Sequence, residues 1–136
     1  MPRDAGRADA PWRWLENARA DLALAQAGLP PGALYEHLCF HAQQAAEKGL
    51  KAVLLQRGIE FPFTHNLQIL LDLLPAGLAV APGIVEAVDL NPYAVTTRYP
   101  GEIEPATEND WREAVRIAEM VVDWVKTIIE SPPPRV

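Results

Sequence analysis

The sequence predicts an all-α protein, an up-and-down bundle of four to five helices. Apolar residues recur three and four positions apart in segments separated by proline and glycine, which is the period of an amphipathic helix. No segment shows the strict alternation of a half-buried strand, and no internal repeat is visible. The 136 residues suffice for one domain with a buried core, which we place at 10–130 between flexible termini at 1–9 and 131–136.

The first helix is expected over residues 10–28. Asp9 is a candidate cap and Pro11 suits the opening turn, while Gly28 and the two prolines after it end the helix. The residues that form its apolar stripe are Trp14, Leu15, Ala18, Leu22 and Ala25.

The second helix is the longest, over residues 32–57, with Gly58 as its C-terminal cap. It carries two adjacent apolar seams, so we expect neighbours on more than one side and a central position. The members of the first seam are Leu34, Leu38, Ala42, Ala45, Gly49 and Val53, and those of the second are Cys39, Ala46, Leu50 and Leu54. Glu47, Lys48 and Lys51 are expected on the remaining polar face.

A brief third helix is expected over residues 67–74, capped by Thr64 or Asn66 and stopped by Pro75. A fourth helix begins near Pro82, and Pro92 bends or interrupts it.

The last helix is expected over residues 110–130, after a polar and turn-like segment at 101–109. The stripe of this last helix contains Trp111, Val115, Ala118, Val122 and Val125.

The amino-acid composition bears on the cellular compartment in which we expect the protein. Apolar residues make up 49% of the chain and charged residues 22%, which is ordinary for a globular protein, and no run approaches the ~18 apolar residues of a membrane span. The polar N-terminus predicts no secretory signal, and Cys39 is the only cysteine, so no internal disulfide can form. We therefore expect a cytoplasmic protein that contacts no membrane.

The net charge of −6 constrains any nucleic-acid partner. Nonspecific binding to nucleic acid draws most of its affinity from neutralising phosphates with lysine and arginine. An acidic chain cannot do this over its whole surface, so a local group of cations would have to bind any RNA or nucleotide.

His37 and His41 stand four apart on one helix, which is a metal-ligand spacing. No second helix supplies the further ligands of a metal site, so we interpret both as surface or interface histidines and expect no metal or other cofactor. Cys39 lies between apolar seams without an activating base nearby in sequence, which indicates a buried structural thiol.

Two further groups have competing interpretations. Lys48 and Lys51 form either a solvated strip or a phosphate-facing pair, and spacing alone favours the strip. His65 is either part of a helix cap or a functional side chain.

Arg98 precedes Tyr99 and Pro100, and the proline disfavours a helical conformation for the tyrosine. The arginine is expected at a helix end or in a loop, where it either binds an anion or pairs with Glu102, Glu104 or Glu47.

Four segments in this order resemble the HEPN domain family. They are Ala-Arg-Ala-Asp-Leu at 18–22, Phe40 with Gln-Gln-Ala-Ala-Glu-Lys-Gly-Leu-Lys at 43–51, Thr-His-Asn-Leu at 64–67 and Thr-Arg-Tyr-Pro at 97–100. The resemblance covers the chain from about Trp14 to Ile128.

The resemblance implies a helical bundle that forms a two-fold homodimer. Such domains are often encoded beside a minimal nucleotidyltransferase, and the pair acts as a prokaryotic toxin and antitoxin. Active members are metal-independent ribonucleases, in which four to six residues stand between an arginine and a following histidine. Two copies of this motif face a cleft at the dimer interface.

Arg98 matches the arginine of that motif, but positions 103–105 hold Ile103, Glu104 and Pro105. The leading hypothesis is therefore a HEPN-type homodimer that binds a nucleotide or RNA through Arg98, Tyr99 and Lys51 and pairs with a nucleotidyltransferase. The second is a metal-independent endoribonuclease that uses Arg98 with His65 or Glu102 as an unorthodox base. The third is a dimeric scaffold without a ligand.

Overall fold

Five helices make up the part of the chain that the computed structural model describes, residues 10–94 and 104–131. They are α1 (Pro11–Gln26), α2 (Tyr35–Gln56), α3 (Leu67–Asp72), the 3₁₀ helix η1 (Ile84–Tyr93) and α4 (Glu108–Glu130). No strand occurs within these described ranges. The all-α prediction is therefore confirmed.

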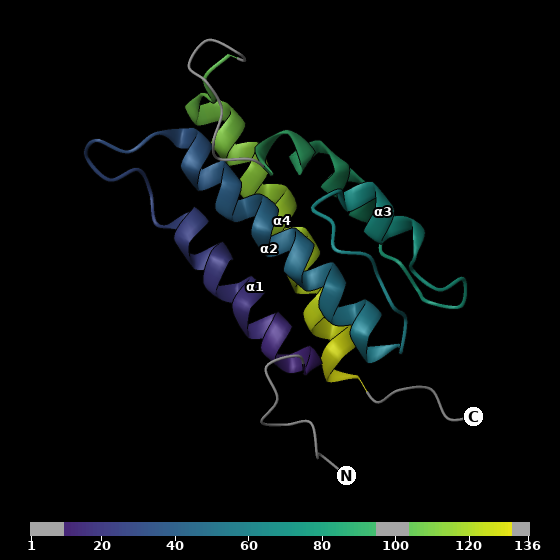
Figure 1. Cartoon of the computed structure of the whole chain (residues 1–136). Coiled ribbons are helices and arrows are strands. Elements are labelled where there is room, and N and C mark those ends of the chain that lie inside the picture. The colour runs from purple at the N-terminus through teal and green to yellow at the C-terminus, as the bar shows by residue number, and fades with distance from the viewer. Residues whose placement is uncertain (1–9, 95–103, 132–136) are drawn as a thin grey trace.

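The three long helices lie side by side, and the two short ones pack along one flank of α2 (Figure 1). The chain ascends α1, descends α2, returns through α3 and η1, and then descends α4 (Figure 1). Helix α2 contacts each of the other four described helices. The predicted up-and-down order and the central position of α2 are both correct. Within the described ranges, no helix has the length and apolar character needed to cross a bilayer.

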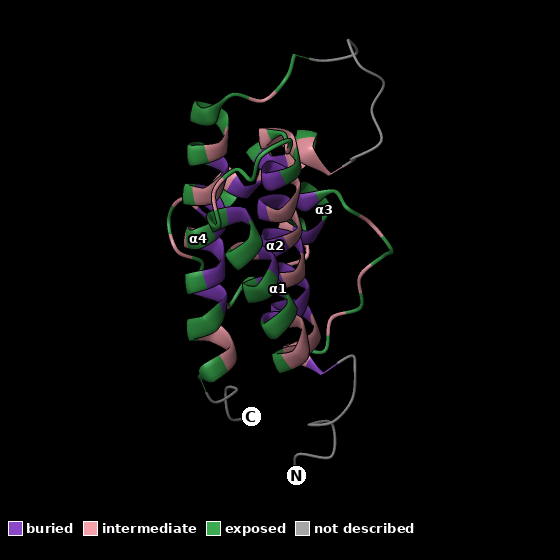
Figure 2. Ribbon diagram, turned by 90° about the vertical axis from the view of Figure 1, so that its left-hand side faces the viewer, coloured by how far each residue is buried: buried purple, intermediate pink, exposed green. Residues whose placement is uncertain are grey.

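The core lies where the buried faces of α1, α2 and α4 meet (Figure 2). From Leu38 onward both predicted seams of α2 are buried, and only Leu34, which precedes the helix, is exposed. Gly49 permits a close approach to α4, because a Cβ built on it would lie 3.2 Å from Val125 Cγ2. The small residues of α2 thus allow the close packing that the sequence predicts.

Glycine and proline set several helix ends. Pro11 opens α1 as predicted, but Ala10 is its N-cap and makes no side-chain capping bond. Helix α2 begins at Tyr35 and not at 32, because Gly32 has φ of +82° and cannot continue a right-handed helix backward. Asn66 caps α3 by accepting a hydrogen bond from the Gln68 amide.

Helix α4 begins at Glu108, so the predicted turn at 101–109 is wrong for its last two residues. Thr107 Oγ1 accepts from the Asp110 amide at 3.1 Å, and Asp110 Oδ2 accepts from the Thr107 amide at 2.9 Å. This capping box satisfies amides that have no intrahelical partner, and it starts the helix two residues earlier than predicted.

The predicted fourth helix is a 3₁₀ helix that starts at Ile84, after Gly83 with φ of +93°. Pro92 lies inside it, one residue before its end. Proline cannot donate the hydrogen bond of an α-helix and clashes with the preceding turn, which explains why the segment ends there. The interruption at Pro92 is thus confirmed, while the helix type differs from the expectation.

Candidate functional site

Three polar side chains of α2 are buried on one face of the helix. Gln43, Glu47 and Lys51 are spaced four residues apart and are 0%, 3% and 6% exposed. The predicted solvated face is therefore wrong for Glu47 and Lys51, although Lys48 remains partly exposed. The reason is tertiary: α3 and η1 pack on α2, and His65, just before α3, reaches Glu47.

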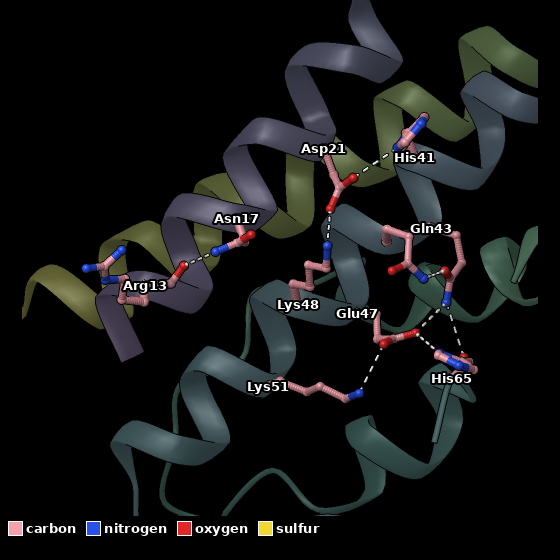
Figure 3. Close-up of polar contacts among 10 residues, drawn as sticks. Arg13, Asn17, Asp21, His41, Gln43, Glu47, Lys48, Lys51 and His65 are labelled. Carbon is pink, nitrogen blue, oxygen red and sulfur yellow. Dashed lines mark hydrogen bonds and ion pairs between the residues drawn. The ribbon is translucent and has the colours of Figure 1, made fainter. Parts of the chain in front are cut away.

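The carboxylate of Glu47 lies at the centre of this group (Figure 3). Its Oε2 accepts from Lys51 Nζ at 3.0 Å, and its Oε1 accepts from Gln43 Nε2 at 3.1 Å. The same Oε1 lies 2.9 Å from His65 Nδ1. A buried carboxylate is stable only with an opposite charge and with hydrogen bonds on its oxygens, and Glu47 has both.

His65 connects this buried polar group to the protein surface. Its side chain is 54% exposed, whereas its Nδ1 contacts the buried Glu47. Gln43 Nε2 also donates to the His65 carbonyl at 3.2 Å, so both backbone and ring are held. When the ring is neutral, an ionised carboxylate can only accept from it, so the proton is on Nδ1 and the lone pair is on Nε2. Nε2 makes no hydrogen bond with any residue that the structure describes.

A depression of about 290 Å³ opens beside His65 and is also lined by Asn66, Asn91 and Ala94. The two asparagines fix its wall. Asn91 Nδ2 donates to Asn66 Oδ1 at 3.1 Å, and Asn91 Oδ1 accepts from the Leu67 amide at 2.9 Å. Sequence reasoning missed Asn91, because an asparagine before a proline reads as an ordinary helix-ending residue.

Aromatic rings surround the ammonium of Lys51. Its Nζ lies 5.8, 5.6 and 5.9 Å from the ring centroids of Trp14, Phe61 and Phe63. Trp14 and Phe61 also contact each other edge to face, with centroids 6.2 Å apart. The ammonium therefore has cation–π contacts in addition to its ion pair with Glu47, in a setting with little water.

A second charged group joins α1 to α2. Asp21 Oδ1 lies 2.9 Å from His41 Nδ1, and Asp21 Oδ2 accepts from Lys48 Nζ at 2.7 Å (Figure 3). His41 thus lies at the contact between α1 and α2, with its ring partly exposed. Within residues 10–94 and 104–131, no three His, Cys, Asp or Glu side chains gather in an arrangement that could hold a metal ion.

Comparison with known proteins decides the family. The family model of the HEPN domain matches residues 11–128. The chain belongs to the HEPN domain family. It is similar to the crystal structure of TT1696 from Thermus thermophilus, with 35% identity and a TM-score of 0.76 over 88% of this chain and 98% of that one. It is also similar to ST0689, an archaeal HEPN homologue, with 30% identity and a TM-score of 0.69 over 89% of this chain and 98% of that one. No curated protein matches the chain.

Arg98, the residue expected to match the arginine of the HEPN motif, lies in the gap between the two described parts of the chain. Arg98, Tyr99 and Glu102 lie outside the described residues, so their roles stay predictions. Ala94, which lines the depression, is the last described residue before them. Glu104, on the other side of the gap, is exposed.

Cys39 is a buried thiol of this HEPN domain, as predicted. Burial raises its pKa from the ordinary 9.0 to about 11, and the negative charge of Asp110 acts in the same direction. A hydrogen bond with Tyr93 opposes them. The thiol is therefore neutral at physiological pH, which excludes an activated nucleophile at this position.

The raised pKa of Cys39 predicts a loss of stability at high pH. Below pH 9 the folded and unfolded states both hold the proton, so the thiol adds no pH dependence. Between pH 9 and about 11 only the unfolded state releases it, and the free energy of unfolding is expected to fall by about 2–3 kcal/mol. Urea unfolding of wild type and Cys39→Ala across this range measures the effect, and parallel pH profiles would contradict it.

Proposed function

We propose that this chain is a dimeric HEPN module that binds a nucleotide or RNA without cutting it and pairs with a nucleotidyltransferase. One observation carries the binding proposal. The His65 ring is held by a buried carboxylate at the rim of the depression that Asn66 and Asn91 line, and Ala94, which also lines it, directly precedes the segment that contains Arg98 and Tyr99. Because this support fixes the orientation of a ring that is exposed to solvent, the arrangement favours a ligand-contacting role.

The charges around the depression suit a phosphate. Among the residues that the structure describes, none that lines the depression is acidic, although the whole chain carries a net charge of −6. Glu47 is the nearest carboxylate behind His65, and Lys51 neutralises it at 3.0 Å. In this proposal Lys51 acts from the interior, where its positive charge offsets the carboxylate that would otherwise repel an anion.

Arg98 and Tyr99 complete the proposed site. Arg98 follows Ala94 by four residues, a span of at most about 14 Å in an extended chain, so its guanidinium can reach a ligand in the depression. A guanidinium can donate two parallel hydrogen bonds to one phosphate, and a tyrosine ring can stack on a base. The homodimer expected of this family would bring two such sites together.

The ribonuclease alternative gains support from one specific contact. The positions where the motif predicts a histidine hold none, but Glu47 fixes the tautomer of His65 that presents a lone pair on Nε2. An imidazole oriented in this way is a better proton acceptor at neutral pH than a carboxylate such as that of Glu102. His65 with Arg98 could then supply the base and the charge stabiliser of a metal-independent cleavage.

One experiment tests both functions. A labelled single-stranded RNA is titrated with purified protein in EDTA, and binding is followed by fluorescence anisotropy and cleavage on a gel. We expect Arg98→Ala to weaken binding about 10-fold and to reduce the slope of log K against log salt by about one, because one phosphate contact is lost. Lys126→Ala, which removes an exposed cation of α4, is the matched control and should bind like wild type.

The outcomes separate the hypotheses. Intact RNA with weakened binding by Arg98→Ala supports the binding module, whereas cleavage that disappears in His65→Ala and Arg98→Ala establishes the ribonuclease. If the folded wild-type protein binds no RNA, only the scaffold hypothesis remains. Light scattering of the same samples should give twice 15.0 kDa, and a monomeric mass at micromolar concentration would rule out a shared cleft. A nucleotidyltransferase gene next to this one would support the pairing.

A further inference from the structure

Phe63 is the most exposed large apolar residue of the described chain, at 98%. It lies in the connection between α2 and α3, two residues before His65. Leaving a phenylalanine in water forgoes about 2 kcal/mol of burial energy. Its neighbour Phe61 is partly buried against the core, so the connection could bury an aromatic ring but leaves this one outside.

The connection holds Phe63 in place on both sides. Pro62 fixes one backbone angle immediately before it. Thr64 Oγ1 accepts from the Asn66 amide at 3.0 Å, and His65 is tied to α2 through its carbonyl and its ring. Because the backbone is held, only the side-chain torsions of Phe63 have to be ordered when a ligand binds to its ring.

Polar and charged groups lie on one side of the exposed ring. Lys51 Nζ lies 5.9 Å from its centroid, and the His65 ring contacts it at 6.1 Å with an interplanar angle of 69°. The next residues toward the depression are Asn66 and, across from it, Asn91. An apolar protein segment or a lipid would leave these groups without partners, whereas a flat ring with polar edges and an attached phosphate would satisfy them.

We infer that Phe63 is a stacking platform for an unpaired nucleobase, next to the phosphate-binding part of the site. The inference rests on the proposed nucleotide or RNA binding and names the ligand class: single-stranded RNA or a free nucleotide, and not a duplex. Base-paired strands hide their base faces, so only a splayed base can stack on a side chain. The polar edge of that base would meet Asn66 Nδ2, which donates no hydrogen bond within the described part of the chain.

The test compares ligands with and without bases. Short oligoadenylate, adenosine monophosphate and an abasic sugar–phosphate strand are titrated against wild type, Phe63→Ala and Phe63→Tyr. We expect Phe63→Ala to weaken oligoadenylate binding by about 5- to 100-fold, and Phe63→Tyr to bind within about 2-fold of wild type. The abasic strand should bind all three proteins equally. The dependence of the binding constant on salt should also be the same for all three, because no phosphate contact is lost. Weakening with adenosine monophosphate as well would identify a free nucleotide as a sufficient ligand.

Leu34→Ala, at a second exposed apolar residue of the described chain, is the matched control and should bind like wild type. Equal binding of oligoadenylate by wild type and Phe63→Ala overturns the stacking inference and leaves the proposed function intact. Absence of any binding by wild type overturns both. A Phe63→Ala protein that becomes monomeric while its affinity is unchanged would show instead that a second copy covers the ring.

Discussion

Replacing Glu47 by alanine is expected to lower the free energy of unfolding by about 3–5 kcal/mol. The substitution leaves Lys51, 6% exposed, as a buried ammonium without its counter-charge. It also removes one of the two acceptors of Gln43 Nε2 and the partner of His65 Nδ1. Urea unfolding followed by circular dichroism measures the change.

Two control variants test whether the loss of stability comes from leaving a buried charge unpaired or merely from breaking an ion pair. Glu47→Leu combined with Lys51→Met removes both charges and should recover most of the loss, because an apolar pair of similar volume can replace a buried ion pair at little cost. Arg112→Ala breaks an exposed pair with Glu108 at the same i, i+4 spacing and should cost at most about 0.5 kcal/mol. A Glu47→Ala loss no larger than that of Arg112→Ala would contradict the buried network.

The second large effect is expected at Gly49. Gly49→Leu should destabilise the protein by about 3 kcal/mol or more, because the new Cβ alone would lie 3.2 Å from Val125 Cγ2 and the rest of the side chain has no space between α2 and α4. Both helices belong to the core, so neither can move away without losing other contacts. Thermal unfolding of the variant measures the loss.

The companion variants test whether crowding is the cause. Adding Val125→Ala to Gly49→Leu should restore part of the stability, since it removes the methyl groups that the leucine meets. Gly77 has no positive φ, and a Cβ added to it would meet no heavy atom within 4 Å, so Gly77→Leu should change stability by less than about 1 kcal/mol. Equal losses at Gly49 and Gly77 would show that the approach of α4 to α2 is not tight.

The Glu47 network also links stability to function. The network holds both the backbone and the ring of His65. A variant that loosens the ring without unfolding the protein would therefore show how much the orientation of the ring contributes to RNA binding. Glu47→Gln keeps an acceptor oxygen near His65 but removes the negative charge that balances Lys51. Comparing the RNA affinity of Glu47→Gln with that of His65→Ala separates the effect of orienting the His65 ring from the effect of having the ring at all.

The sequence alone determined where the helices lie, with the ends of the α-helices within three residues of those observed. The apolar spacing of α1, α2 and α4, the proline that opens α1 and the asparagine that caps α3 are local features, and a local period is enough to specify a helix. It also determined that α2 is central, because two seams on one helix require neighbours on two sides. The family followed from short segments that keep their order along the chain, and the match over residues 11–128 confirmed it.

Only the tertiary structure decided which polar residues meet. Glu47 and Lys51 read as a solvated face, since helical spacing places them opposite the seams, yet they are buried. The period of a helix specifies which residues share a face, but not which segment distant in sequence covers that face. Here His65 and Phe61 follow the end of α2 and reach back to it, and this places a histidine 2.9 Å from a carboxylate that lies 18 residues earlier in the chain.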